Sequence, residues 1–207
     1  MNSPKKLFLI DSYALIFRSY YAFIKNPMRN SKGMNTSTVF GFTLTLHELL
    51  RKEDPTHIIA AFDASAPTFR HAMYKPYKAN RDATPEDVRE SVPWIKKLLT
   101  AYKIPVIEKA GYEADDIIGT IAKNAEKQGF EVYMVTPDKD FAQLVSDKIF
   151  MYKPGRSGNP AEILGIPEIL EKFQIKDTKQ VIDILALWGD SSDNIPGAPG
   201  IGEKTAK

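Results

Sequence analysis

Three apolar runs that end at an aspartate constrain the fold more than any other feature of the sequence. They span residues 6–11, 57–63 and 130–138, and helix-patterned sequence separates them. Short continuous apolar runs are typical of strands that are buried on both faces of a parallel sheet. Strands that alternate with helices predict an α/β fold, with a mostly parallel sheet flanked by helices.

The rest of the chain supplies the other elements of this fold. Two further apolar runs, 104–107 and 149–152, predict strands. Helical patterns cover 12–23, 38–52, 84–102, 113–129, 167–173 and 178–188. The helix at 84–102 begins with a capping residue, a proline and an acid, which together form a start signal. Pro93 lacks the N–H that a helix interior needs, so we expect it to kink or restart this helix.

The composition excludes several classes of site. The 207 residues include no cysteine, which rules out a disulfide framework, a zinc–thiolate site and a catalytic thiol. The apolar run near the N-terminus is too short for a signal-peptide core or a membrane span, so we expect a cytoplasmic protein without a membrane partner. The charge is +7 over residues 1–112 and −5 over residues 113–207. The first part is suited to a polyanion, and the second supplies many acids.

Three acids open the helix that begins near residue 113. Glu113, Asp115 and Asp116 precede apolar residues at helical spacing, which places them in its first turn. Successive helical residues are rotated by about 100°, so the three side chains fan out from one helix end. Acids in a first turn compensate the helix dipole, and this explains one or two of them without any site. The alternative is a metal-binding cluster, which requires more acids at the same place.

Other acids converge on that helix end. In α/β sheets, ligands bind beyond the carboxyl ends of the strands, and a helix that follows a strand begins at the same edge. The acids that end the three apolar runs are therefore expected beside the helix acids; they are Asp11, Asp63 and Asp138. Three later acids are expected to reach the same edge: Asp140, Asp190 and Asp193.

Such a cluster requires cations to neutralise it. Two carboxylates about 4 Å apart repel each other by about 4 kcal/mol at an effective dielectric constant of 20. Oxygen ligands without Cys or His suit Mg²⁺, and Mn²⁺ can substitute for it. Two such ions about 3.5–4 Å apart catalyse phosphodiester hydrolysis, because one activates water and the other stabilises the leaving oxygen. The acids therefore predict a two-metal site for a phosphate ester.

A basic and aromatic stretch indicates which ester this is. Tyr74, Lys75, Tyr77, Lys78 and Arg81 interleave rings with cations, as in a channel for single-stranded nucleic acid. If the stretch is helical, Lys78 and Arg81 share a face at i and i+3 and can hold the scissile phosphate. The competing interpretation of this stretch is a solvated loop.

Glycines near the C-terminus indicate a second phosphate contact. Gly200 and Gly202 lie just before an expected helix start, where backbone N–H groups and the helix dipole attract a phosphate. A Gly-x-Gly motif is weak when it stands alone, so this contact depends on the other motifs.

Taken together, these motifs resemble the 5′-nuclease family, the 5′-3′ exonuclease and flap endonuclease domain found at the N-terminus of bacterial DNA polymerase I. The resemblance spans almost the whole chain in the same order. It is carried by residues 62–71, 77–81, 113–116, 138–140 and 189–206.

The resemblance implies a PIN-like nuclease domain over residues 1–173, with a helical arch. A helix-3-turn-helix DNA-binding element would begin at residue 174 and be truncated at residue 207. The implied activity is two-metal hydrolysis of DNA with a 5′ flap or a single-strand/duplex junction, in replication and repair at the nucleoid. The implied cofactors are two Mg²⁺ ions without any small-molecule cofactor, and a K⁺ ion at the glycine turn. A polymerase domain can follow in the full-length chain.

The family pattern also implies a role for each matching residue. The first metal cluster would consist of Asp11, Asp63, Glu113, Asp115 and Asp116. The second would consist of Asp138, Asp140, Asp190 and Asp193. The catalytic residues would be Lys78, Arg81 and Asp116. The DNA contacts would be Arg18, Arg70, Tyr77, Lys78, Arg81, Gly200, Gly202, Lys204 and Thr205, and among these Tyr77 would stack on a base.

Two other functions are compatible with the same motifs. One is a structure-specific DNA-binding module without catalytic activity, but all nine expected acids are present, which counts against it. The other is a PIN-type ribonuclease, but the glycine turn that contains Lys204 suits duplex DNA.

Overall fold

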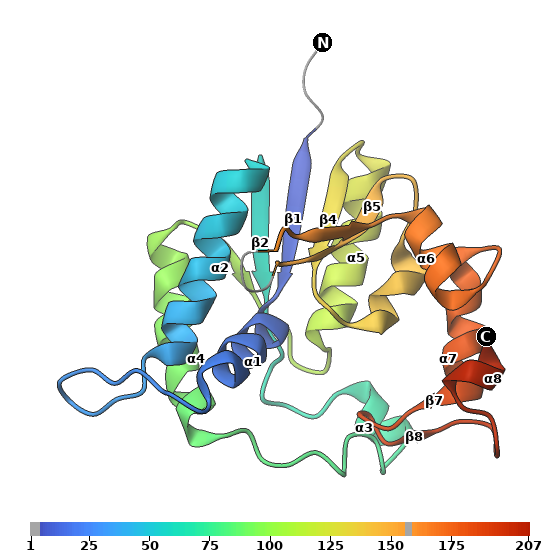
Figure 1. The fold of residues 1–207 in the computed structure, drawn as a ribbon, viewed down its shortest axis with the longest axis horizontal. Helices are drawn as coiled ribbons and strands as arrows, with labels where there is room; N and C mark the ends of the chain where they lie inside the picture. The colour runs from blue at the N-terminus through green and yellow to red at the C-terminus, as the bar shows by residue number, and fades with distance from the viewer. Residues whose placement is uncertain (1–4, 156–158) are drawn as a thin grey trace.

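The computed structural model describes residues 5–155 and 159–207, and it confirms the α/β fold (Figure 1). One sheet of six strands has the order β3-β2-β1-β4-β5-β6. Strands β1 to β5 are parallel to one another, and β6 is antiparallel to β5. The strands are β1 Lys6–Asp11, β2 His57–Ala61, β3 Val106–Ile107, β4 Glu131–Val135, β5 Ile149–Lys153 and β6 Glu162–Leu164.

Strand β1 lies in the middle of the sheet, between β2 and β4. The chain runs outward from β1 through β2 to β3, and it then returns to the other side of β1 as β4. This reversal makes a switch point between the carboxyl ends of β1 and β4, where α/β sheets bind ligands. Asp11 is the last residue of β1, and Asp138 follows the end of β4, so both acids lie at the switch point.

Helices cover both faces of the sheet (Figure 1). One face carries α1 Ser12–Phe23, α2 Ser37–Glu53 and α4 Glu86–Ala101, and the other carries α5 Ala114–Lys127, α6 Ile166–Phe173 and α7 Val181–Trp188. Alternate side chains of a strand point to opposite faces, so a continuous apolar run needs a helical layer on each side. In β1, Phe8 and Ile10 pack in one core, and Leu7 and Leu9 pack in the other.

Some short elements differ from the prediction or add to it. The prediction contains neither β6 nor the antiparallel hairpin of β7 Gly189–Asp190 with β8 Ile195–Pro196, because two or three residues are too few to show a period. Helix α4 continues through Pro93 and does not restart there. The remaining elements are α3 Phe69–Met73, the 3₁₀-helices η1 Lys139–Leu144 and η2 Thr178–Gln180, and α8 Glu203–Ala206. Within the described ranges, every helix is too short or too polar to span a bilayer.

We expect the core on the α2 face to carry much of the stability. Phe42 is fully buried, whereas Phe40 on the same helix is 45% exposed. Phe42→Ala should lower the free energy of unfolding by about 3–5 kcal/mol, because it leaves a cavity. Phe40→Ala should lower it by no more than about 1.5 kcal/mol, through the ring contact of Phe40 with Phe23. Urea unfolding followed by circular dichroism measures both, and equal losses would contradict this packing.

Candidate active site

The side chain of Asp11, at the end of β1, is buried and held by hydrogen bonds. It is buried at 8% exposure and also caps α1, because its Oδ1 accepts a hydrogen bond from the backbone N–H of Ala14 at 3.1 Å. Its Oδ2 accepts a hydrogen bond from the hydroxyl of Thr136 at 2.9 Å. Burial raises the pKa of Asp11 to about 6, and nearby Asp63 and Asp138 add repulsion. The cap therefore fixes a carboxylate that holds its proton more tightly than usual.

The two other acids that follow strands also cap local structure. Asp63 lies beyond the end of β2, and its Oδ1 accepts a hydrogen bond from the N–H of Ala114, the first residue of α5, at 2.7 Å. Asp138 opens η1 by accepting a hydrogen bond from the N–H of Asp140 at 3.0 Å. The first contact attaches the loop after β2 to the start of α5, and the second fixes the turn that follows β4.

A cavity of about 630 Å³ opens at this edge of the sheet. Six acids line it, five of them predicted site residues: Asp11, Asp63, Glu113, Asp115 and Asp138, together with Asp82. Lys78 and Arg81 line it too. An adjoining cavity of about 170 Å³ shares Glu113 and Asp115 with the first and adds Asp140 and Asp193. The structure therefore gathers seven of the nine predicted acids around two neighbouring cavities.

Asp115 is the acid whose protonation this cluster changes most. Burial raises the pKa of Asp115 to about 8, and repulsion from Asp11, Asp138 and Asp63 contributes in that order. Among the described residues, none makes a hydrogen bond to its carboxylate. The charge of Lys78 offsets this only in part, and a bound cation would offset more of it.

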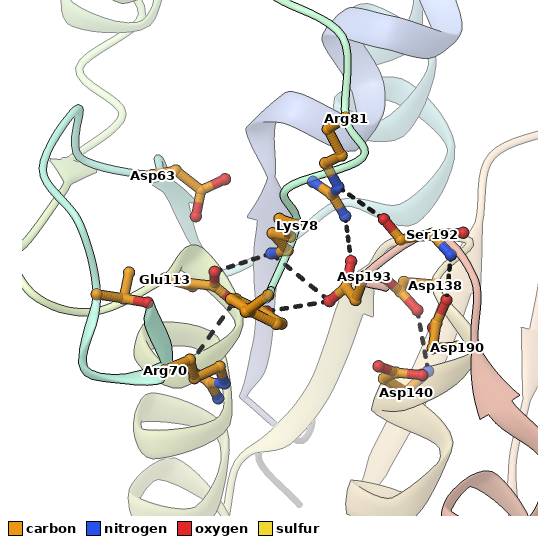
Figure 2. Close-up of polar contacts among 12 residues, drawn as sticks. Asp63, Arg70, Lys78, Arg81, Glu113, Asp138, Asp140, Asp190, Ser192 and Asp193 are labelled. Atoms are coloured by element: carbon orange, nitrogen blue, oxygen red, sulfur yellow. Dashed lines mark hydrogen bonds and ion pairs between the residues drawn. The ribbon is translucent and has the colours of Figure 1, made fainter. Parts of the chain in front are cut away.

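Basic side chains neutralise the acids nearest to α3. Arg70 binds Asp116 through two parallel hydrogen bonds of 2.8 Å each. Lys78 Nζ lies 2.8 Å from Glu113 Oε1 and 3.7 Å from Asp193 Oδ2, so it bridges the two carboxylates (Figure 2). The paired hydrogen bonds from Arg70 lower the pKa of Asp116 against the opposing effect of burial. Asp116 is thus directed toward Arg70, and it lines neither of the two described cavities.

A third basic residue pairs with Asp190 and lies near Asp140. Lys139 Nζ binds Asp190 Oδ2 at 2.6 Å and lies 3.6 Å from Asp140 Oδ1. Burial is the largest single influence on Asp190 and opposes its ionisation. The hydrogen bonds from Lys139 and from backbone N–H groups, together with the charge of Lys139, outweigh it and lower the pKa of Asp190. Asp140 Oδ1 is buried without a hydrogen-bond partner, and burial together with repulsion from Asp138 raises the pKa of Asp140 to about 6.

In the described part of the chain, no group of three or more Asp, Glu, His or Cys side chains is arranged so that it could hold a metal ion as it stands. The acids share an edge, but caps and ion pairs keep them apart. Two observations nevertheless fit a hard divalent cation: the buried oxygen of Asp140 that accepts no hydrogen bond, and the raised pKa of Asp115. The donor set is also oxygen alone, as Mg²⁺ prefers.

The structure corrects the prediction that Lys78 and Arg81 share a helix face. Helix α3 ends at Met73, and the residues after it form turns. Lys78 has a left-handed backbone with φ of 56°, which no α-helix contains. Pro76 also lacks the N–H that a helix through this segment would need. The two cations reach the same cavity, but from a turn.

Tyr77 and Arg18 also lie differently from their expected roles. The ring of Tyr77 is buried, and its hydroxyl donates hydrogen bonds to Glu113 at 2.9 Å and Asp193 at 3.0 Å. In this conformation the ring is not available to stack on a base. Arg18 donates hydrogen bonds to Thr45 Oγ1 at 3.3 Å and to the carbonyl oxygens of Pro154, at 3.3 Å, and Gly155. It does not line the larger cavity.

The glycine turn at the C-terminal end is exposed. Gly200 has a left-handed backbone with φ of 79°, a conformation that glycine adopts readily. Gly202 precedes α8, and the side chains of Lys204 and Thr205 in that helix are exposed. The four residues predicted to contact duplex DNA therefore lie together on the surface.

Thr136 and Lys139 are site residues that the sequence prediction missed. The hydroxyl of Thr136 donates to Asp11 and accepts from the N–H of Asp138 at 3.2 Å, so it joins the ends of β1 and β4. In the sequence, Thr136 stands between a buried strand and an acid, and this position could have indicated that it belongs to the site. Lys139 lies between Asp138 and Asp140 in sequence, and a basic residue between two acids could have indicated an ion pair at the site.

Comparison with known proteins relates this site to a family. The model described as "5'-3' exonuclease, N-terminal resolvase-like domain" matches residues 6–174, and the model described as "5'-3' exonuclease, C-terminal SAM fold" matches residues 176–207. DNA polymerase I of Bacillus subtilis is 45% identical over 206 residues. The match covers 100% of this chain but 23% of that protein, so the chain spans about a quarter of the length of such relatives.

Solved structures share the fold. T5 5′-exonuclease with bound divalent zinc ions has a TM-score of 0.76 and 24% identity, over 97% of this chain and 73% of that chain. The bacteriophage T5 D15 flap endonuclease, in a pseudo-enzyme-product complex with DNA and metal ions, has a TM-score of 0.75 and 24% identity. That match covers 97% of this chain and 72% of that chain. At such identities, the likeness concerns the arrangement of the chain.

We expect the Asp115 carboxyl to titrate near pH 8 in the metal-free protein. Asp138→Asn should lower this midpoint, because it removes a neighbouring negative charge that disfavours ionisation. Asp147→Asn, in the turn before β5, should leave it unchanged. Carbon-13 NMR of the carboxyl group against pH measures the midpoint. A midpoint near the ordinary value of 3.8 in the unsubstituted protein would contradict the described crowding.

Proposed function

The chain belongs to the family of 5′-3′ exonucleases with an N-terminal resolvase-like domain, and on that premise we propose what it does. The family resemblance predicted from its motifs is thereby confirmed. Its activity is structure-specific 5′-3′ exonuclease and flap endonuclease cleavage of DNA. The substrate carries a 5′ flap or a single-strand/duplex junction, and the bond broken is a phosphodiester.

One observation supports this proposal above the others. Two adjoining cavities share Glu113 and Asp115, and Lys78 and Arg81 line the larger one. Acids that line a cavity can bind cations, and basic side chains that line the same cavity can bind a phosphate. A site for a small neutral ligand would need neither.

The residues of the chain divide the work of such a reaction. When bound, two Mg²⁺ ions, or Mn²⁺ ions in their place, supply Lewis acidity and lower the pKa of a bound water. The acids that line the cavities would hold them: Asp11, Asp63, Glu113, Asp115, Asp138, Asp140 and Asp193. Lys78 and Arg81 would stabilise negative charge on the phosphate. Asp190 and Asp116 remain predicted ligands, and each is now paired with a cation.

The same proposal places the chain in a larger protein. It would act as the N-terminal part of a DNA polymerase I, in replication and repair, in the cytoplasm at the nucleoid. Residues 1–173 would form the nuclease domain. Residues 174–207 would begin the domain that holds duplex DNA, through Gly200, Gly202, Lys204 and Thr205, with a K⁺ ion at the glycine turn.

A cleavage assay on a labelled 5′-flap DNA with Mg²⁺ tests this function. Asp63→Asn should keep the cap on α5, because Asn also accepts hydrogen bonds, yet remove a charge from the cavity. We expect its cleavage rate to fall by at least about 10³-fold, because the removed carboxylate would hold a catalytic ion, while flap binding in a gel shift changes little.

Asp147→Asn is the matched control and should cleave at the unsubstituted rate. Binding without Mg²⁺-dependent product in the unsubstituted chain would favour a DNA-binding module. Faster cleavage of an RNA flap than of a DNA flap would favour a ribonuclease.

Mg²⁺ should stabilise the protein more at pH 8 than at pH 6. The pKa of Asp115 is raised in the folded state, so its contribution to the stability of the metal-free protein is lost as pH rises from about 4 to 8. A metal ion requires the deprotonated acid, so each pH unit below 8 weakens its binding by up to about tenfold. Melting temperatures measured with and without Mg²⁺ at each pH would show the difference. Equal stabilisation at both pH values would contradict it. Asp115→Asn should reduce the difference to the part that comes from Asp11 and Asp140, whose pKa values are about 6.

A further inference from the structure

Hydrogen bonds join two segments that are far apart in sequence. They lie beside the acidic edge, which is the edge of the sheet where the predicted acids line the two cavities. The first is the turn segment 76–81, which carries Lys78 and Arg81. The second is the hairpin segment 189–196, which contains β7 and β8. Figure 1 shows α3 and the chain after it lying beside β7 and β8, and Figure 2 shows Arg81 against Ser192 and Asp193.

Backbone groups of one segment are bound from the other on both sides. Asn80 Nδ2 donates to the carbonyl oxygen of Ser191 at 2.7 Å. In the opposite direction, Asn194 Nδ2 donates to the carbonyl oxygen of Pro76 at 2.8 Å. Between these two contacts, the N–H of Lys78 donates to the carbonyl oxygen of Asp193 at 2.9 Å.

These three hydrogen bonds, here called the clamp, surround a stretch of backbone in an unfavourable conformation. Lys78 and Asn194 both have left-handed backbones, with φ of 56° and 57°. Asn adopts this region because its short polar side chain bonds locally, but Lys does so less readily. Such a residue persists where its surroundings fix it. Here the N–H of Lys78, the carbonyl oxygen of Pro76 and the side chain of Asn80 are all bound to the hairpin.

The conformation of Lys78 decides where the charges lie. From this backbone, Lys78 Nζ reaches Glu113 at 2.8 Å, and the guanidinium of Arg81 reaches both Asp193 and the carbonyl oxygen of Ser192, the latter at 3.1 Å. Neither asparagine lines the larger cavity. Their amide groups donate to carbonyl oxygens of the two segments.

The hairpin is packed closely against the end of α7. Gly189 has φ of 79°, and a Cβ atom at Gly197 would lie 2.4 Å from the backbone of Trp188, so the hairpin closes directly onto the end of α7. The N–H of Ala198 also donates to the carbonyl oxygen of Leu187 at 2.8 Å. The segment that continues from here contains the glycine turn at Gly200 and Gly202.

We propose that Asn80 and Asn194 are positioning residues, whose amide groups clamp the turn 76–81 to the hairpin 189–196 and thereby hold Lys78 and Arg81 at the acidic edge. The proposal rests on the proposed function. It adds that the hairpin preceding the duplex-binding turn sets the place of the phosphate-binding cations, although neither asparagine touches the substrate.

Asn80→Asp and Asn194→Asp test the clamp with little change in size. Each replaces a donor by an oxygen that repels the carbonyl it faced, and Asp still tolerates a left-handed backbone. We expect single-turnover cleavage of a 5′-flap DNA with Mg²⁺ to slow by about tenfold or more, because displaced cations lose alignment with the phosphate. Flap binding should change by less than about threefold. Asn124→Asp, an exposed position on α5, is the control and should cleave at the unsubstituted rate.

A background that lacks both cations separates positioning from a general structural role. If Asn80 acts through Lys78 and Arg81, Asn80→Asp should cost little in a Lys78→Ala, Arg81→Ala background, because both cations that it places are already absent. An equal loss in both backgrounds would overturn the proposal. Melting temperatures of all variants show whether each one folds, and Asn80→Ser serves as a second variant if Asn80→Asp does not.

Hydrogen exchange of the Lys78 amide gives a readout without substrate. Loss of either asparagine amide should speed this exchange by about tenfold or more, because the N–H of Lys78 would open more often toward water. Unchanged exchange in both variants would overturn the clamp. If the unsubstituted chain cleaves no flap, the proposed function fails, and the exchange rate then decides the clamp on its own.

Discussion

Repulsion between carboxylates at one edge of the sheet is the constraint on which the rest of this structure depends. The topology brings the acids at the end of β1, after β2 and β4 and at the start of α5 to one cavity. The protein meets the repulsion in three ways. Asp11 and Asp63 accept hydrogen bonds from backbone N–H groups, Asp116 and Asp190 pair with cations, and Asp115 keeps its proton up to a pH of about 8.

These three responses make the edge selective for what enters it. A divalent cation would replace the proton of Asp115 and would compete with Lys78 for Glu113, so its binding and the release of a basic side chain would be linked. A phosphate can then attract that side chain in place of the carboxylate. The ion pairs of the metal-free protein thus keep both charges close to where the reaction would need them.

The sequence predicted the elements whose signal is local. Apolar runs identify the strands, and the rule that ligands bind at strand ends is enough to assign Asp11, Asp63 and Asp138 to one edge of the sheet. What it could not predict depends on partners distant along the chain. The left-handed turn at Lys78 is held by Asp193, and Tyr77 is buried because Glu113 and Asp193 accept its hydroxyl. The basic and aromatic pattern alone is equally compatible with an exposed helix.

The hydrogen bond from Ala14 to Asp11 has a consequence for how this protein can change over time. Because one carboxylate oxygen starts α1 while the other faces Thr136, a mutation that removes the whole side chain damages a helix as well as the cavity. Asparagine preserves a capping oxygen and removes the charge. The replacement of one oxygen atom by nitrogen at this position would therefore remove the charge and keep the helix cap. A lineage could lose the activity in this way while its fold survived.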